Sequence, residues 1–236
     1  MNKILNVIKD WSEVWATLIP LTIYLIKRPR YKWLKPILFY LLVTLVLYLV
    51  IDIIWKRRSL GLDNWFKENF QVFYDENGFL KNTIFYNFVS IARLLFLSWF
   101  FNYMDPIYKK LNRYIPLFFL ILTAVNFIFF EKIEDFSSRL ITLEAFILLV
   151  YCILFFFKIL RSERIETNEE RNGFRVVIGL SIYVAVNFFI FLLYKQLTVS
   201  FRDFAKAIWP FHNAVNLIFC IFISIAFWNY GRSRTQ

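Results

Sequence analysis

Residues 33–55 read WLKPILFYLLVTLVLYLVIDIIW, an apolar run in which only Lys35 and Asp52, near its two ends, are charged. About 20 apolar residues in a helix match the hydrocarbon core of a bilayer, which is about 30 Å thick. That core holds no water to satisfy backbone N–H and C=O groups, so a chain crossing it forms a helix. This stretch therefore predicts a transmembrane helix.

Six further runs have similar composition, and none shows the alternation typical of a barrel strand. We predict an all-α polytopic membrane bundle of about seven transmembrane helices, with residues 1–236 forming a single transmembrane domain. The first run is short and contains Pro20. The predicted spans are Trp11–Ile26, Trp33–Trp55, Asn82–Tyr103, Tyr114–Phe130, Ser138–Phe157, Phe174–Tyr194 and Ala207–Trp228.

The composition agrees with a membrane protein. Hydrophobic residues make up 59% of the chain, whereas soluble domains hold about 45–50%. A net charge of +11 would point to nucleic acid in a soluble protein, but here the basic residues flank apolar runs. We therefore expect contact with the lipid bilayer and its anionic headgroups, and no nucleic acid. Cys152 and Cys220 lie within apolar runs, which predicts buried free thiols.

The basic residues around the first span predict its orientation. Only Lys3 and Lys9 precede that span, and five basic residues follow it: Lys27, Arg28, Arg30, Lys32 and Lys35. Because Lys and Arg near the first helix resist translocation, we predict an N-terminus outside and a C-terminus inside. The expected location is the cell membrane, as the cytoplasmic membrane of a bacterium.

Two connections are longer or more charged than the others. Residues 56–81 mix aromatic and charged residues and contain Asn77-Gly78, which predicts an interfacial amphipathic segment or a small hairpin on the outer face. Residues 158–175 carry many Glu and Arg residues, which predicts a charged inner loop. That loop is either a solvated helical extension of the fifth span or a docking site for a cytoplasmic partner.

Many polar residues within the predicted spans lie at a similar depth in the membrane. Because successive spans alternate in direction, residues early in odd-numbered spans share a leaflet with residues late in even-numbered spans. The polar residues found at these positions predict a polar cavity near the outer face. They are Asn87, Ser90, Thr142, Glu144, His212, Asn213, Asn216, Asp52, Thr123, Asn126 and Asn187.

Arg93 lies near the centre of the third span, where a charged side chain costs about 2.5–3.5 kcal/mol on insertion scales. Glu144 is the only carboxylate within a predicted span and away from its edge. We therefore predict that the two residues pair, directly or through water or a ligand. Two roles stay open: a buried salt bridge that fixes helix register, or an arginine that binds a carboxylate or phosphate.

His212 is the only histidine, and it is either a hydrogen-bonded core residue or a proton sensor. No second His or Cys stands at metal-ligand spacing, so we expect no metal. The chain lacks HExxH, GxSxG and Walker A motifs, and it has no lysine between Ala207 and Trp228 to bind retinal. We therefore expect a non-catalytic protein without a cofactor.

Spans four to seven carry the only family resemblance. The residues concerned are 126–130, the aromatic end of the fifth span, Ile182-Tyr183, Asn187-Phe188, Ile208-Trp209, His212 and Asn216. Over about half of the chain, this pattern resembles an uncharacterised seven-helix membrane domain of bacteria, found alone or as the input module of histidine kinases. The resemblance implies a sensory or partner-regulating role. Because the chain ends at Gln236 without a kinase, any output is expected to pass through a separate signalling protein.

The leading hypothesis is a membrane receptor or regulatory module that binds a small polar or anionic ligand in the outer-leaflet cavity. The candidate ligand-binding residues are Arg93, Glu144, Asn87, Asn126, Asn187, His212 and Asn216. One alternative is a channel or transporter for a small anionic solute, in which the same groups line a path. Another is a structural accessory subunit of a membrane complex, which needs no cavity.

Overall fold

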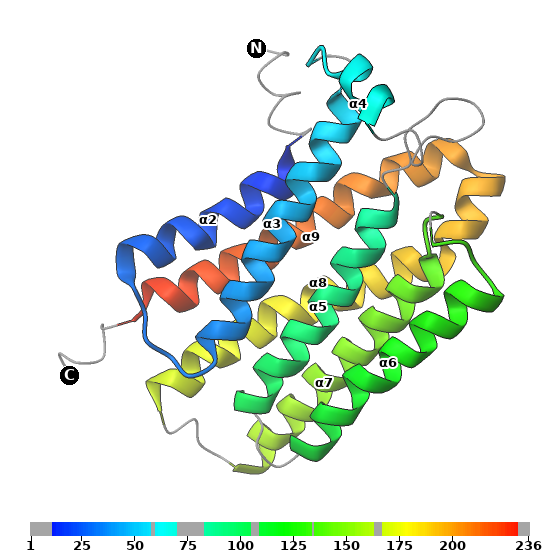
Figure 1. The fold of residues 1–236 in the computed structure, drawn as a ribbon. Coiled ribbons are helices and arrows are strands. Elements are labelled where there is room, and N and C mark those ends of the chain that lie inside the picture. Colours follow the sequence, from blue (N-terminus) through cyan, green and yellow to red (C-terminus); the bar gives the residue numbers. More distant parts are fainter. Residues whose placement is uncertain are drawn as a thin grey trace.

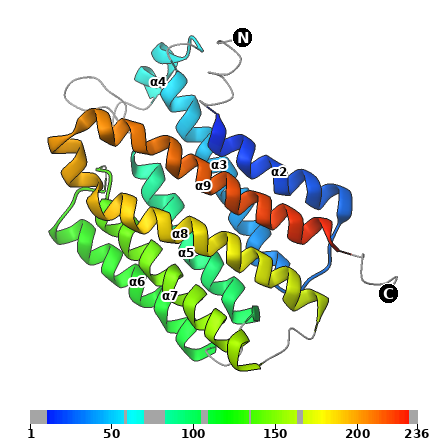
Figure 2. The ribbon, with the colours of Figure 1, turned by 180° about the vertical axis from the view of Figure 1, so that it is seen from behind.

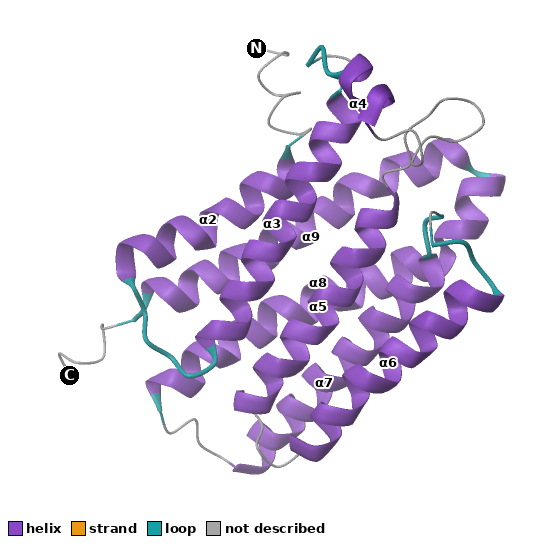
Figure 3. Ribbon diagram, viewed as in Figure 1, coloured by secondary structure: helices purple, strands orange, loops and turns teal. Residues whose placement is uncertain are grey.

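The computed structural model describes residues 11–57, 60–69, 83–104, 109–133, 135–162 and 167–230, and these residues are helical almost throughout, without a strand (Figure 3). The helices are α2 (Ser12–Lys27), α3 (Leu34–Lys56), α4 (Asp63–Asn69), α5 (Thr83–Met104), α6 (Lys109–Phe129), α7 (Ser138–Ser162), α8 (Asn168–Ser200) and α9 (Arg202–Trp228). The predicted all-α fold class is thus confirmed for the described residues.

Six of these helices are long and apolar enough to cross a bilayer, the pattern of a multi-pass membrane protein. The candidate spans are Leu34–Lys56, Thr83–Met104, Asn112–Phe129, Ser138–Arg161, Asn168–Tyr194 and Ile208–Trp228. The first predicted span, Trp11–Ile26, corresponds to α2, which has 16 residues and is not among these six. At 1.5 Å per residue, α2 is about 24 Å long, shorter than the hydrocarbon core. The prediction of seven spans is therefore confirmed for six.

The long helices form a ring with one helix outside it. Each of α2, α3, α5, α7, α8 and α9 packs against its neighbour in that order, and α9 closes the ring against α2. The helix α6 packs mainly against α5 and only slightly against α7, and it lies at the edge of the bundle (Figures 1 and 2). Most of its surface therefore faces the surroundings, which explains its many exposed apolar side chains.

Four helices, α6, α7, α8 and α9, extend further than the hydropathy predicted, and α7 does so by five residues at its end. The helix α8 spans 33 residues, because its polar first turns, which begin at Asn168, continue the helix before the apolar run. Both α6 and α9 begin about five residues earlier than predicted, so Pro116 and Pro210 lie inside helices, as Pro20 does in α2. A proline inside a helix removes one backbone hydrogen bond. An apolar run predicts the membrane segment of a helix. It does not predict the polar residues that continue the helix at either end.

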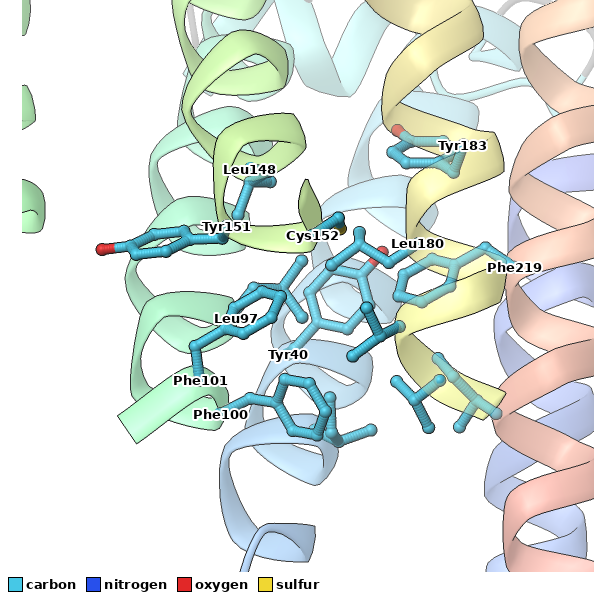
Figure 4. Packing of buried hydrophobic residues seen from close by; sticks show 14 of the residues in the cluster. Tyr40, Leu97, Phe100, Phe101, Leu148, Tyr151, Cys152, Leu180, Tyr183 and Phe219 are labelled. Atoms are coloured by element: carbon cyan, nitrogen blue, oxygen red, sulfur yellow. The ribbon is translucent and has the colours of Figure 1, made fainter. Parts of the chain in front are cut away.

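The buried apolar side chains gather in the half of the bundle that contains the α2–α3 loop. The main cluster draws on the start of α3, the end of α5, the middle of α7, the first half of α8 and the end of α9. Figure 4 shows Tyr40, Phe100, Leu180 and Phe219 pointing toward one another in this cluster. Burial of such aromatic and aliphatic side chains fills this half with apolar groups. Most of the buried polar residues lie in the other half, which we call the α4 end, beside two smaller apolar clusters around Tyr48 and Phe66.

The connection between α3 and α5 begins with the short helix α4, in agreement with an amphipathic segment. Its Phe66 is buried while its Trp65 is exposed. Asp63 accepts a hydrogen bond from Arg57 Nε at 2.9 Å and lies 3.0 Å from Lys67 Nζ. These partners, Lys67 first, hold the pKa of Asp63 below its ordinary value. The predicted hairpin at Asn77-Gly78 lies outside the described residues.

The charged segment between α7 and α8 is helical at both of its ends. Helix α7 runs to Ser162, and α8 begins with a capping box of Thr167 and Glu170, in which each side chain binds the other residue's backbone N–H at 3.1 Å. The residues between, 163–166, lie outside the described part.

The first turns of α8 are joined to the α2–α3 loop. Glu169 accepts the backbone N–H of Lys32 at 2.6 Å, and its carbonyl accepts Trp33 Nε1 at 3.2 Å. Asn172 donates to the Tyr31 hydroxyl at 2.6 Å. Burial raises the pKa of that hydroxyl, and the bond from Asn172 opposes the rise. We call this contact the loop junction.

Two helices approach closely where Gly179 of α8 meets Phe222 of α9. A Cβ at Gly179 would lie 2.5 Å from Phe222 Cβ, which the backbone of α9 holds in place. A Cβ at Gly173 would instead meet Met104 Cε at 2.2 Å, the far end of a flexible side chain. Gly179 thus sets the separation of α8 and α9, while Gly173 leaves room for adjustment.

We expect Gly179→Ala to lower the free energy of unfolding by about 1–3 kcal/mol, because the helices must separate to admit the methyl group. The matched control Gly173→Ala should cost less, since the Met104 thioether can move and alanine favours the helix by about 1 kcal/mol. Unfolding in mild detergent by heat or by SDS measures both. Equal losses in the two variants would contradict this account of the α8–α9 contact.

Candidate functional site

The predicted pair of Arg93 and Glu144 is present. Arg93 Nε of α5 lies 3.5 Å from Glu144 Oε1 of α7, and the two side chains are only 6% and 1% exposed. Ser90 Oγ, one turn before Arg93, donates to Glu144 Oε2 at 2.7 Å. The spacing of three residues places Ser90 and Arg93 on one face of α5, so both reach the same carboxylate.

Arg93 also binds α8. Its guanidinium donates to the Tyr183 hydroxyl, and its Cζ lies 4.9 Å from the centroid of the Tyr183 ring. The ring therefore contributes a cation–π contact as well as an acceptor. Arg93 thus joins three helices, α5, α7 and α8, by polar contacts in a buried setting.

A second group of polar contacts continues the cluster to α9 and α2. His212 Nδ1 of α9 lies 2.8 Å from Asn187 Oδ1 of α8, and the ring of Tyr183 lies beside the imidazole at 6.0 Å between centroids. On the other side, His212 Nε2 lies 3.7 Å from Glu13 Oε1 of α2. Asn216 is one turn further along α9 and fully buried. We call this set the polar core: Glu13, Ser90, Arg93, Glu144, Tyr183, Asn187, His212 and Asn216.

Two of the predicted ligand-binding residues bind the α6–α7 connection instead. Asn87 donates to the carbonyls of Ile133 and Asp135 at 3.1 and 2.9 Å and accepts the backbone N–H of Ser137. Asn126 donates to the side chains of Glu131 and Ser137 at 3.0 and 3.2 Å. Both residues share the depth of the polar core, but their amides hold a loop in place.

Of the remaining polar residues of the predicted cavity, Thr123 and Thr142 have partners in their own helices, Asn213 has a partner in α2, and Asp52 is buried near the end of α3. Thr123 and Thr142 donate to the carbonyls of Phe119 and Ser138, four residues earlier in their own helices, as buried threonines commonly do. Asn213 donates to Ser12 Oγ at 2.9 Å. Depth alone therefore predicted more site residues than the helix faces allow.

The polar core is closed to solvent and incompletely hydrogen-bonded. Each of its eight side chains except Asn216 has a polar contact described above, and all eight are buried. Five of its atoms nevertheless make no hydrogen bond: Glu13 Oε1, Arg93 Nε, Glu144 Oε1, Asn187 Nδ2 and Asn216 Nδ2. A buried polar atom without a partner costs about 1–3 kcal/mol. These residues thus form a buried polar cluster in which five atoms make no hydrogen bond, although Arg93 Nε and Glu144 Oε1 face each other as an ion pair.

The polar core contains two carboxylates, Glu13 and Glu144, and one guanidinium, that of Arg93. Arg93 is matched by Glu144, whereas Glu13 has His212 at 3.7 Å as its nearest ion-pair partner. An unmatched buried carboxylate is unfavourable in a medium of low dielectric constant. A group that donates hydrogen bonds or carries positive charge therefore suits this side of the polar core better than an anion.

Aromatic side chains cover the polar core on its α4 side. Trp209 and Phe191 lie 5.2 and 5.3 Å from the His212 ring, and Phe136 lies 5.2 Å from Tyr194. Tyr86 meets Trp209 edge to face at 5.5 Å. Each of these residues lies nearer the α4 end of its helix or loop than the polar residues beside it. These five rings, which we call the aromatic layer, separate the polar core from that end of the bundle.

Sequence reasoning missed Glu13 and Tyr183. Glu13 stood at the edge of the shortest predicted span, yet it is buried because α2 packs along α9. Tyr183 was noted only for the family resemblance, although it precedes Asn187 by one helical turn and so shares its face. Cys152 and Cys220 are buried and free, as predicted. Among the described residues, no group of three His, Cys, Asp or Glu side chains is placed to hold a metal ion.

No protein-family model matches the chain, and no curated protein or solved structure is significantly similar to it. The functional proposal below therefore rests on the geometry of the polar core.

Replacement of Glu144 by leucine should lower the free energy of unfolding by about 3–5 kcal/mol, because it leaves the Arg93 guanidinium buried without its counter-charge. The double variant Arg93→Met/Glu144→Leu should recover most of that loss, since it removes both charges. SDS-induced unfolding in mixed micelles measures the series, with Glu68→Leu on the exposed face of α4 as control. Purely additive losses in the double variant would show that the two residues do not act as a pair.

Proposed function

We propose that the protein is a non-catalytic membrane receptor or regulatory module in which a small polar ligand completes the polar core. The observation that supports this most directly is the set of five buried polar atoms without hydrogen bonds, contributed by α2, α5, α7, α8 and α9. A ligand that satisfies them would bind one arrangement of these helices better than another, and would thereby shift the population of conformations.

The chemistry of the polar core restricts the chemical class of the ligand. Arg93 already has a carboxylate, a hydroxyl and an aromatic face as partners, so an anion would have to displace Glu144. Glu13 and the amides of Asn187 and Asn216 offer acceptors and donors that are not used. A small neutral or cationic compound, such as an amine, fits these groups better than the anionic solute expected from Arg93 alone.

A route for the signal is provided by α8. This helix carries Tyr183 and Asn187 in the polar core and Glu169 at the loop junction. The 18 residues between Glu169 and Asn187 correspond to about 27 Å along a helix. A displacement of α8 in the polar core would therefore reach the α2–α3 loop, where a partner can read it. Because the chain resembles kinase input modules, the partner we propose is a separate signalling protein.

A transporter or channel is the second candidate function. Pro210 lies in α9, two residues before His212, and leaves the preceding turn with one backbone hydrogen bond fewer. Such a site allows a helix to bend beside a substrate. A transporter would carry the ligand across the membrane, whereas a receptor only binds it.

We further propose that α2 crosses the membrane as a seventh span, with the N-terminus and the α4 end outside and the C-terminus inside a bacterial cytoplasmic membrane. The five basic residues at and after the end of α2 support this orientation. The contacts of α2 with both α9 and α3 support its place within the bundle.

The ligand proposal predicts a thermal shift. Purified protein in detergent is heated in the presence of a panel of amines, amino acids, sugars and carboxylates. At least one amine or neutral compound should raise Tm by several degrees in the wild type and in the exposed control Glu68→Gln, because binding to the folded state stabilises it. The shift should vanish in Glu13→Gln, which keeps the shape of Glu13 and removes its charge.

A panel without any stabilising compound, or an equal shift in Glu13→Gln, would refute the proposed ligand site. Uptake of the stabilising compound into protein-containing liposomes would assign the second candidate function instead.

The topology proposal predicts opposite labelling of two exposed positions. In a chain whose two native cysteines are buried, Glu68→Cys should react with a membrane-impermeant maleimide in intact cells, and Arg30→Cys only after permeabilisation. An epitope tag placed before Met1 should be accessible in intact cells if α2 spans the membrane. A tag that requires permeabilisation would place α2 on the same side as the loop after it.

A further inference from the structure

A groove lies between α6 and α7 on the outside of the bundle, separate from the polar core. It has a volume of about 270 Å³ and is lined by Leu122, Thr123, Val125, Asn126 and Phe130 from α6 and its end, and by Arg139, Leu140 and Leu143 from α7. Most of these side chains are apolar, and several of their neighbours on α6 are exposed apolar residues. The groove therefore opens toward the hydrocarbon of the membrane.

The groove exists because α6 and α7 are held apart. Both helices pack against α5, but they contact each other only slightly although they follow one another in the chain. Their connection is tied to α5 by Asn87, which binds Ile133, Asp135 and Ser137. The separation is thus built into the fold.

A cationic side chain lies at the α4 end of the groove. Arg139, the second residue of α7, is 59% exposed, and its Nε lies 3.7 Å from Glu131 Oε1, which is longer than a hydrogen bond. The other carboxylate oxygen of Glu131 already accepts from Asn126 and Ser137. The Arg139 guanidinium therefore has donors available for a second anion, at the depth where a membrane helix begins and phospholipid headgroups lie.

We propose that this groove binds one anionic phospholipid, with an acyl chain along Leu122, Val125 and Leu143 and the phosphate bound by Arg139. Water is excluded from the hydrocarbon region, so an apolar groove that faces it is filled by lipid chains. A groove with fixed walls and a cation at its end holds one lipid longer than the surrounding bilayer surface does. The basic character of the chain, with a net charge of +11, agrees with an anionic headgroup.

The test uses full-length protein from mixed micelles with phosphatidylglycerol or phosphatidylcholine, and native mass spectrometry to count the lipids retained. The wild type should retain one phosphatidylglycerol in preference to phosphatidylcholine. In Arg139→Gln this preference should fall about fivefold, the effect of one basic side chain near an anionic headgroup. The matched control Arg113→Gln removes an exposed arginine near the other end of α6 and should leave the preference unchanged.

A second variant, Leu143→Trp, fills the groove and should reduce retention of both lipids, provided that Tm shows a folded protein. Three outcomes would overturn the proposal: no retained lipid in the wild type, equal retention of both lipids, or equal behaviour of Arg139→Gln and Arg113→Gln. Because none of these variants touches the polar core, their outcome is independent of the ligand proposed for that site.

Discussion

A guanidinium that stays charged inside a membrane bundle requires a counter-charge and acceptors from its neighbours, and the arrangement of Arg93 follows from this requirement. Glu144 supplies the charge from α7, and Tyr183 supplies a hydroxyl and an aromatic face from α8. Each contact fixes the rotation of one helix relative to α5, because a helix turned by one residue would carry its partner out of reach. The register of the α5, α7 and α8 side of the ring thus depends on one buried charge.

The two halves of the bundle have different physical characters. Around the α2–α3 loop, interlocked aromatic and aliphatic side chains form a dense apolar cluster, which resists rearrangement. Toward α4, the polar core keeps donors and acceptors unused beneath the aromatic layer. Apolar packing fixes the helices at one end, whereas the other end has polar groups that a ligand or water molecules can satisfy. Movement of the helices is therefore expected at the α4 end. A displacement of α8 there would reach the α2–α3 loop through the loop junction.

Much of this arrangement follows from the sequence. Apolar runs located six spanning helices, because the bilayer leaves helix as the available structure for such runs. The alternation of span directions placed Glu144, Asn187, His212 and Asn216 at one depth, and the structure brings them into one buried cluster with Arg93 from the middle of its span. The lone carboxylate within a span identified the partner of Arg93.

The other features of the site depend on the rotation and tilt of each helix, and hydropathy carries no information on either. Asn87 and Asn126 share the depth of the polar core, yet their helix faces turn them to the α6–α7 connection. Glu13 lies at the end of a short helix, where solvent exposure was the simpler expectation, and its burial arises from the packing of α2 along α9. Polar helix ends such as the first turns of α8 carry no apolar signal and were placed in a loop.

The contact between Glu13 and His212 joins the first described helix of the chain to the last, 199 positions later. During synthesis the Glu13 carboxylate is made long before the His212 imidazole, because α2 precedes α9 in the chain. An unfinished chain therefore carries an acidic group without its counterpart, and only the arrival of α9 completes the ring. Closure of the ring therefore awaits the synthesis of α9, and a chain that lacks this helix leaves the Glu13 carboxylate without its imidazole neighbour.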